Sequence, residues 1–235
     1  MITTDLHPAD EEGGQEFRSR TSETYARIHG DVVSGKLKPG VKLKIEQLRE
    51  EYDVGATPVR EALSFLAADG LVVREDQKGF RVAEVSADEF EDLLAVRCMI
   101  EERALRLAIS RGGRKWEEGV VLARFRLSGV GRIEGNEVEW ERHHRAFHMS
   151  LLAACGSSLL LRLSKQFYDE NNRYRHLSRL NHATTRDVRN EHEEIAEAVL
   201  ARDADRAVGL LVEHYTKTGN LLRIALKDLA TDGHG

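Results

Sequence analysis

The feature that most constrains this chain is a series of three short helical patterns followed directly by two β-prone stretches, all between residues 21 and 82. Apolar residues at helical spacing predict a first helix from Thr21, with Ser22 as its N-cap. The glycines and proline of Gly35–Gly40 break this helix. A second helix is predicted over Ile45–Tyr52, and a tight turn separates it from the third.

The third helix is predicted to begin with Thr57 as N-cap and Pro58 at the first helical position, where a missing N–H does no harm. Two β-prone runs, Leu71–Arg74 and Phe80–Val82, then predict a hairpin. Three short helices with a tight turn before the third, followed by a hairpin, describe a winged helix-turn-helix.

The outer face of the third helix suits contact with DNA. Thr57, Arg60 and Ser64 recur at i, i+3 and i+7, opposite the apolar face, so that this face could enter a major groove. The overall charge does not favour DNA binding, because the net charge is −5 and residues 15–82 hold 12 Lys and Arg against 11 Asp and Glu. A DNA-binding surface therefore depends on where single basic residues lie.

After Ser86, which with Glu89 has the spacing of a capping box, the pattern changes to longer helices. The first of these ends at Gly112-Gly113. The later helical patterns cover Trp116–Leu127, Val138–Ala154, Ser157–Ser178, Arg186–Ala201 and Ala204–Leu229. We predict a mainly α fold, in which an N-terminal winged helix-turn-helix precedes a C-terminal all-α six-helix bundle.

The expected division is a flexible tail over residues 1–20, a winged helix-turn-helix over 21–83, and an all-helical domain over 86–230. The N-terminus is acidic, and no apolar run approaches the length of a membrane span, so neither a signal peptide nor a membrane location is expected. The two cysteines, Cys98 and Cys155, are far apart in sequence and fit a reducing cytoplasm.

Four of the histidines have a spacing that predicts a metal site. His144 and His148 are four residues apart, on one face of a helix. His192 lies 11 residues before the break at Asp203, and His214 lies 11 residues after it. In a helix hairpin these two would lie at the same height, so four imidazoles could converge on Zn, Ni, Cu or Fe. The alternative is that the four are scattered histidines without a common ligand.

Three arginines could bind an anion. Arg97 lies near the apolar face of the first bundle helix, and a buried arginine needs a negative partner. That partner is either Glu101, four residues on, or the carboxylate of a ligand held by Arg97 together with Arg173 or Arg175.

Motifs in both parts resemble one family. The stretch from SGKLKPG through PVREAL to the glycine-containing wing resembles the winged-helix domain of GntR transcription regulators. The later motifs, including HHRAFHMSLLAACGS, NNRYR and VEHY, resemble their FadR-type all-helical effector domain, the FCD domain. The H-x-x-x-F-H and RYR details are most similar to the carbon-starvation-induced regulator branch, which responds to small dicarboxylates.

The resemblance implies a homodimer that binds pseudo-palindromic operator DNA, usually as a repressor, and makes residues 86–230 the effector-binding and dimerisation domain. Arg60 matches the arginine of the recognition helix, and Lys78 and Gly79 match the tip of the wing. Two bases common in the family are absent, because their positions hold Ala56 and Glu46. The operator sequence of relatives therefore cannot be carried over.

The resemblance also implies a metal and an effector in the bundle. His148, His192 and His214 match metal-ligand positions, and a first ligand that is often Asp is His144 here. This change removes a negative charge and favours a softer divalent metal, with zinc expected and nickel as an alternative. Arg97 matches an arginine that holds the effector's carboxylate. Two other functions stay open: a metal-dependent enzyme with a fused DNA-binding domain, and a direct metal sensor.

Overall fold

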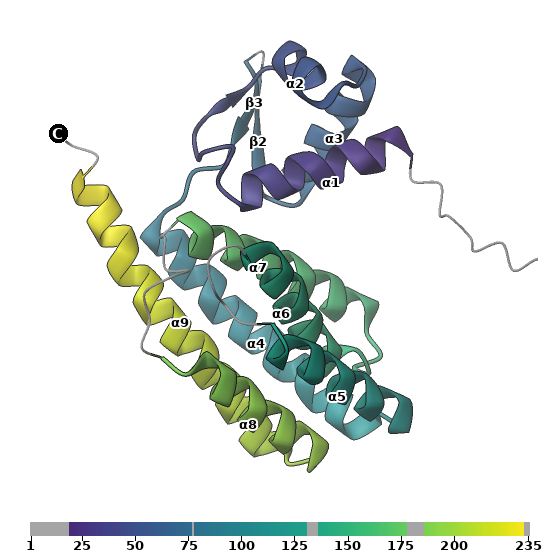
Figure 1. Cartoon of the computed structure of the whole chain (residues 1–235). Coiled ribbons are helices and arrows are strands. Elements are labelled where there is room, and N and C mark those ends of the chain that lie inside the picture. Colours follow the sequence, from purple (N-terminus) through teal and green to yellow (C-terminus); the bar gives the residue numbers. More distant parts are fainter. Residues whose placement is uncertain (1–18, 77, 131–135, 178–185, 233–235) are drawn as a thin grey trace, which may run out of the picture.

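The computed structural model describes residues 19–76, 78–130, 136–177 and 186–232, so almost all of the predicted N-terminal tail lies outside the described residues. The described residues before position 83 form three helices and a small sheet. They are α1 (Arg20–Val33), β1 (Lys42–Leu43), α2 (Ile45–Tyr52), α3 (Ala56–Ala68), β2 (Val72–Glu75) and β3 (Gly79–Val82). This order is that of the predicted winged helix-turn-helix, and the wing is the β2–β3 hairpin (Figure 1).

The sheet has the order β1-β3-β2, with both pairings antiparallel. β1 was not predicted, because it is only two residues long. It forms by pairing with the distant β3, where Lys42 lies opposite Arg81 and Leu43 opposite Phe80. A strand of this length is specified by its partner rather than by its own sequence pattern.

Two predicted helix starts are wrong by a few residues. Ser19, not Ser22, caps α1, and its hydroxyl accepts a hydrogen bond from the backbone N–H of Ser22 at 3.1 Å. Gly55 is the N-cap of α3, so Thr57 and Pro58 occupy the second and third helical positions. Proline is tolerated there because the N–H groups of the whole first turn have no partner within the helix.

The described residues after position 86 form six helices, as predicted. They are α4 (Ala87–Arg111), α5 (Arg114–Ser128), α6 (Glu137–Leu152), α7 (Ser158–Leu177), α8 (Val188–Leu200) and α9 (Ala204–Asp232). Ser86 is the N-cap of α4, and its side chain accepts from the N–H of Glu89 at 3.0 Å. Among the described residues, no helix has both the length and the apolarity to cross a bilayer.

Each part has its own cluster of buried apolar side chains. In the winged helix-turn-helix, Ile28 of α1 packs with Leu63 and Leu66 of α3, all fully buried. In the bundle, the fully buried Phe90 and Phe147 belong to a second cluster. Burying side chains of this size contributes about 1.5–3 kcal/mol each, so each part has a core of its own to hold its functional residues in place.

The two parts meet along α7, on which α1 lies (Figure 1). Gln166 of α7 donates to the backbone carbonyl of Asp69 at 3.4 Å. Arg173 of α7 donates to the backbone carbonyls of Ala83 and Glu84, in the segment that joins β3 to α4. The helix that carries two of the three predicted arginines, Arg173 and Arg175, is therefore also the helix that holds the connection between the two parts.

Candidate functional site

The predicted DNA-reading face of α3 lies on the surface. Thr57, Arg60 and Ser64 are all exposed, and the apolar side of the same helix is buried against α1. The Ser64 hydroxyl donates to the backbone carbonyl of Arg60 at 2.9 Å, which holds it against the helix. Phe65, next to Ser64, is 56% exposed, a large apolar side chain that the polar stripe did not predict.

The predicted wing tip is also exposed. Lys78 and Gly79 are both at the surface where β3 begins. Gly79 has a φ of +93°, a backbone conformation that residues other than glycine rarely adopt. The tip thus offers one lysine on a tight turn, a geometry able to reach a minor groove or a phosphate.

The four predicted histidines converge inside the bundle. His144 and His148 come from α6, His192 from α8 and His214 from α9, and all four are buried. One nitrogen of each lies within 4.8 Å of the others. The rings of His192 and His214 are 4.8 Å apart between centroids, which confirms that the two lie at the same height on either side of the α8–α9 turn.

Hydrogen bonds determine which nitrogen of the His144 ring carries the proton. Its Nδ1 lies 2.6 Å from the Tyr168 hydroxyl, and that hydroxyl donates to Glu141. Because the tyrosine proton is directed at the carboxylate, the hydroxyl oxygen accepts from Nδ1–H of His144. The guanidinium of Arg175 is 3.4 Å from the same nitrogen, a longer contact than the one with Tyr168, so the tyrosine decides the tautomer. The Nε2 atom of His144 therefore carries a lone pair.

His148 is held in the same way. Its Nδ1 lies 3.1 Å from the hydroxyl of Tyr215, and that hydroxyl donates to Glu101. His214 is held directly, because its Nδ1 lies 2.8 Å from a carboxylate oxygen of Glu191. Partners of this kind orient the histidine ligands of metal sites and strengthen them as donors.

These contacts point the free lone pairs at one another. The Nε2 atoms of His144 and His148 are 3.1 Å apart, yet neither carries the proton that a hydrogen bond between them would need. The Nε2 of His192 is buried and has no hydrogen-bond partner among the described residues. A divalent cation would satisfy all of these nitrogens at once, so the residues fit a metal ion.

Burial keeps the imidazoles neutral. It lowers the pKa of His144, His148 and His192 well below the ordinary value for histidine. Burial also lowers the pKa of His214 to about 4, although the hydrogen bond with Glu191 acts in the opposite direction. Neutral imidazole is the form that binds metal.

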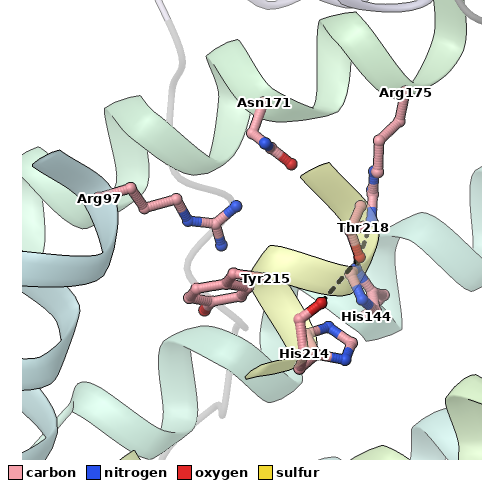
Figure 2. Close-up of a pocket in the computed structure, with 7 residues that line it drawn as sticks. All are labelled: Arg97, His144, Asn171, Arg175, His214, Tyr215 and Thr218. Carbon is pink, nitrogen blue, oxygen red and sulfur yellow. Dashed lines mark hydrogen bonds between the residues drawn. The ribbon is translucent and has the colours of Figure 1, made fainter. Parts of the chain in front are cut away.

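A small pocket adjoins the histidines (Figure 2). Arg97 from α4 and Arg175 from α7 approach it from different sides, and Tyr215 forms its floor, with the Arg97 guanidinium 3.9 Å from the centre of the tyrosine ring. The full lining consists of Arg97, His144, Asn171, Arg175, His214, Tyr215 and Thr218. The cavity volume is about 10 Å³, room for roughly one water molecule.

The three arginines predicted to bind an anion make different contacts in the structure. Arg97 pairs with Glu101 at 2.8 Å, as one of the two alternatives had it, and it also lines the pocket. Arg175 also lines the pocket and donates to Glu141 and to Asn172. Arg173 is not among the lining residues, because its guanidinium is turned to the backbone of Ala83. The pair that can bind an anion is therefore Arg97 and Arg175.

The residues around the histidines were not predicted to orient the imidazole rings. Tyr168, Glu141 and Glu191 reach it from α7, α6 and α8. A tyrosine on a helix looks like an ordinary core residue, and these glutamates look like surface charges. Only Glu191, directly before His192 in the sequence, gave a local signal that a carboxylate was close.

Comparison with known proteins gives matches over both parts of the chain. Residues 20–82 match the family described as bacterial regulatory proteins, gntR family, and residues 92–217 match the FCD domain. The chain is 37% identical over 211 residues to BphR of Paraburkholderia xenovorans (strain LB400), described as an uncharacterized HTH-type transcriptional regulator. That match covers 88% of this chain and 86% of BphR.

A second relative is the HTH-type transcriptional repressor GlaR of Escherichia coli (strain K12). It is 36% identical over 197 residues, which cover 81% of this chain and 90% of GlaR. Among solved structures, E. coli McbR/YncC aligns with a TM-score of 0.75, over 88% of this chain and 98% of that chain. The sequence identity there is 20%, so this likeness concerns the fold alone.

Proposed function

The chain belongs to the gntR family of bacterial regulatory proteins, with an FCD domain after its winged helix-turn-helix, and from this premise we propose that it is a repressor controlled by a small carboxylate. The carboxylate binds beside a divalent metal in the bundle and alters operator affinity. The relatives of this chain are transcriptional regulators, not enzymes. The proposal rests above all on one observation, the approach of Arg97 and Arg175 to a pocket edged by His144 and His214.

DNA binding is assigned to α3 and the wing of two copies of the chain. Thr57, Arg60 and Ser64 enter the major groove, with Arg60 reading a guanine, and Lys78 and Gly79 contact the minor groove or its phosphates. The support is that all five residues are exposed. Two copies acting on one pseudo-palindromic operator would bind half-sites one turn of DNA apart.

The metal would be held by the four histidines. When bound, the metal would supply a fixed positive charge beside the pocket, and this charge would attract a carboxylate oxygen. Four nitrogen ligands without a carboxylate favour zinc, or nickel, over magnesium or manganese. The protein's own part is to orient the rings through Tyr168, Tyr215 and Glu191, and to supply two guanidinium groups for the ligand's negative charge.

Effector binding requires the pocket to open. A cavity of about 10 Å³ is far smaller than the ~300–1,000 Å³ usual for small-molecule sites. A dicarboxylate therefore binds a second conformation, in which α7 or α9 has moved. Because α7 also holds the connection to the winged helix-turn-helix, a ligand that favours the open form also favours another placement of that part.

The test combines operator binding with a ligand series. Duplex DNA from the protein's own promoter is titrated with zinc-loaded protein, with and without linear dicarboxylates of increasing length. We expect one of them to change operator affinity about fivefold or more. Arg97→Lys and Arg175→Lys should still bind DNA but lose the response. A protein that binds every duplex equally, or whose operator affinity no carboxylate changes, would overturn the proposal.

The small cavity also favours a second function, in which the metal itself is the signal. Such a sensor needs room for an ion and none for a carboxylate. Here removing the metal with a chelator should change operator affinity by itself, and Arg97→Lys should leave that change intact. If chelation changes affinity and no carboxylate does, the metal-sensor function replaces the carboxylate-controlled one.

A further inference from the structure

A cleft with a volume of about 710 Å³ lies between the winged helix-turn-helix and the bundle. Its walls come from residues 29–34 of α1, 138–149 of α6 and 165–176 of α7, and we call it the interdomain cleft. It lies where α1 crosses α7 (Figure 1). Its volume is within the ~300–1,000 Å³ usual for small-molecule sites, so a ligand of ordinary size fits without a change of fold.

Apolar side chains from two elements line the interdomain cleft. Val33 comes from α1, and Ala146 and Met149 come from α6. Val138 of α6 also belongs to the lining and is 87% exposed. Covering these side chains with the apolar body of a ligand would remove them from water, which favours binding.

The acidic side chains of the lining are already neutralised. Each of the three has a basic partner within the protein. The pairs are Asp31 with Lys36, Asp169 with Arg145, and Glu141 with Arg175. A cationic ligand would therefore have to compete with an existing ion pair for every carboxylate in the interdomain cleft.

Two basic side chains of the lining are available to a ligand. Lys165 of α7 is exposed and forms no ion pair with any residue that the structure describes. Arg142 of α6 is 3.3 Å from the ring of His143 and 3.6 Å from the exposed Glu139, neither of which lines the cleft. The charge that remains in the interdomain cleft is therefore positive, and it complements an anion.

We propose that the interdomain cleft is a second ligand site, which binds an amphipathic anion with one carboxylate on an apolar chain or ring. The carboxylate lies near Arg142 and Lys165, and the apolar body covers Val33 and Met149. A small dicarboxylate would leave these apolar walls in water. The site goes beyond the proposed function, because it is a different cavity and takes a different class of ligand.

A ligand bound here contacts both parts of the protein. Asp169 of α7 lines the interdomain cleft, and its carboxylate lies 3.4 Å from the ring of His29 on α1. The cleft is thus formed by the same contact that holds the winged helix-turn-helix on the bundle. Because the ligand needs walls from both parts, it favours this placement of the two over any placement that separates them.

The first test is calorimetry with hexanoate, octanoate and decanoate on the full-length, zinc-loaded protein, without free metal in the buffer. Each carries one carboxylate, so the series varies only the apolar chain. Affinity should rise about threefold for each added CH₂ group, because each group is buried against the apolar walls. If decanoate does not bind at millimolar concentration, the proposed site is wrong.

The second test reverses the two available charges. Arg142→Glu/Lys165→Glu should weaken decanoate binding at least about tenfold, because two attractions become repulsions. Lys115→Glu is the matched control, since Lys115 is an exposed lysine of α5 outside the interdomain cleft. The control should bind decanoate like the wild type.

The third test fills the interdomain cleft from α1. Gly30 lines it, and a Cβ atom at this position would meet nothing within 4 Å. Gly30→Leu is therefore accommodated by the helix and occupies space that the ligand needs, so decanoate binding should fall at least about tenfold. Gly119→Leu on α5, where a Cβ atom also meets nothing within 4 Å, is the control. Circular dichroism and zinc content check that each variant is folded.

Arg97→Lys distinguishes the interdomain cleft from the pocket beside the histidines, and this variant should bind decanoate like the wild type. Decanoate binding that survives both Gly30→Leu and the double charge reversal would overturn the proposal. Binding that Arg97→Lys abolishes would also overturn it, because decanoate would then occupy the histidine pocket. Neither result would contradict the proposed function, because the response of operator affinity to dicarboxylates is measured separately.

Discussion

Arg173 and Arg175 are two residues apart on α7, and their guanidinium groups bind different parts of the protein. Arg175 donates to Asn172 at 2.6 Å and lies beside the histidine cluster. Arg173 is buried and donates to the backbone carbonyls of Ala83 and Glu84, in the connection to the winged helix-turn-helix. One turn of helix thus touches both the proposed effector pocket and the segment that positions the DNA-binding part.

Replacing Arg173 should therefore uncouple the two functions. Arg173→Met keeps the apolar stem and removes the donors to the connection. We expect effector affinity, measured by calorimetry, to stay within about twofold of wild type, because Arg173 does not line the pocket. The effector-induced change in operator affinity should largely disappear, a loss of about 1–3 kcal/mol of coupling.

The matched control is Arg162→Met, on an exposed part of the same helix. It removes one arginine of α7 and should leave effector binding and coupling at the wild-type level. If Arg173→Met shows the full effector-induced change in operator affinity, α7 does not transmit the signal through this contact.

A second prediction concerns base reading by α3. Arg60 is exposed and makes no ion pair with any described residue, so it is available to a guanine edge. Arg60→Ala should cost about 1–3 kcal/mol on operator DNA and less on random DNA. Fluorescence anisotropy at fixed salt measures both affinities, and Arg114→Ala on α5 is the control. Equal losses on both duplexes would mean that Arg60 contacts only the phosphate backbone.

Much of the fold was predictable because its signals are local. The bounds predicted for α2, Ile45–Tyr52, are those observed, and Ser86 caps α4 as its spacing with Glu89 indicated. β1 was not predictable from its own residues, since Lys42–Leu43 forms a strand only against β3. The sequence places helices and turns well, and it does not specify a short strand whose partner is distant.

The site was predictable to the extent that helix geometry defines it. Counting residues from the turn at Asp203 was enough to bring His192 and His214 together, because two antiparallel helices on a short turn stay in register. The partners of the rings were not predictable. Whether Tyr168 or Tyr215 faces a histidine or the apolar core depends on how α7 and α9 are rotated in the bundle. The same rotation decides that Arg175, and not Arg173, faces the pocket.

A third prediction concerns the pH dependence of the metal-free protein. The pKa of His214 is lowered by burial from 6.5 to about 4, so between these values the unfolded chain binds a proton that the folded chain does not. The contribution of His214 to stability is therefore complete above about pH 6.5 and is lost as pH falls toward 4. The loss from this group is about 3 kcal/mol, at 1.36 kcal/mol per pKa unit.

Chemical unfolding of the metal-free protein at several pH values between 7 and 4 measures this effect. The free energy of unfolding should fall as the pH falls. His214→Gln, whose side chain does not titrate, should show a shallower dependence over the same range. Identical slopes for the variant and the wild type would mean that His214 does not stay neutral in the folded protein.

The last prediction tests the metal site by its stoichiometry. His148→Ala removes one of the four converging nitrogens, together with the imidazole N–H that the Tyr215 hydroxyl accepts. Zinc bound per chain, measured by mass spectrometry after dialysis, should fall well below one, and the melting temperature of the metal-loaded protein should fall with it. His143→Ala is the matched control, because His143 lies on the same helix but outside the cluster, near Glu139 at 3.8 Å. The control should keep a full equivalent of zinc, so equal metal content in the two variants would exclude the cluster as the binding site.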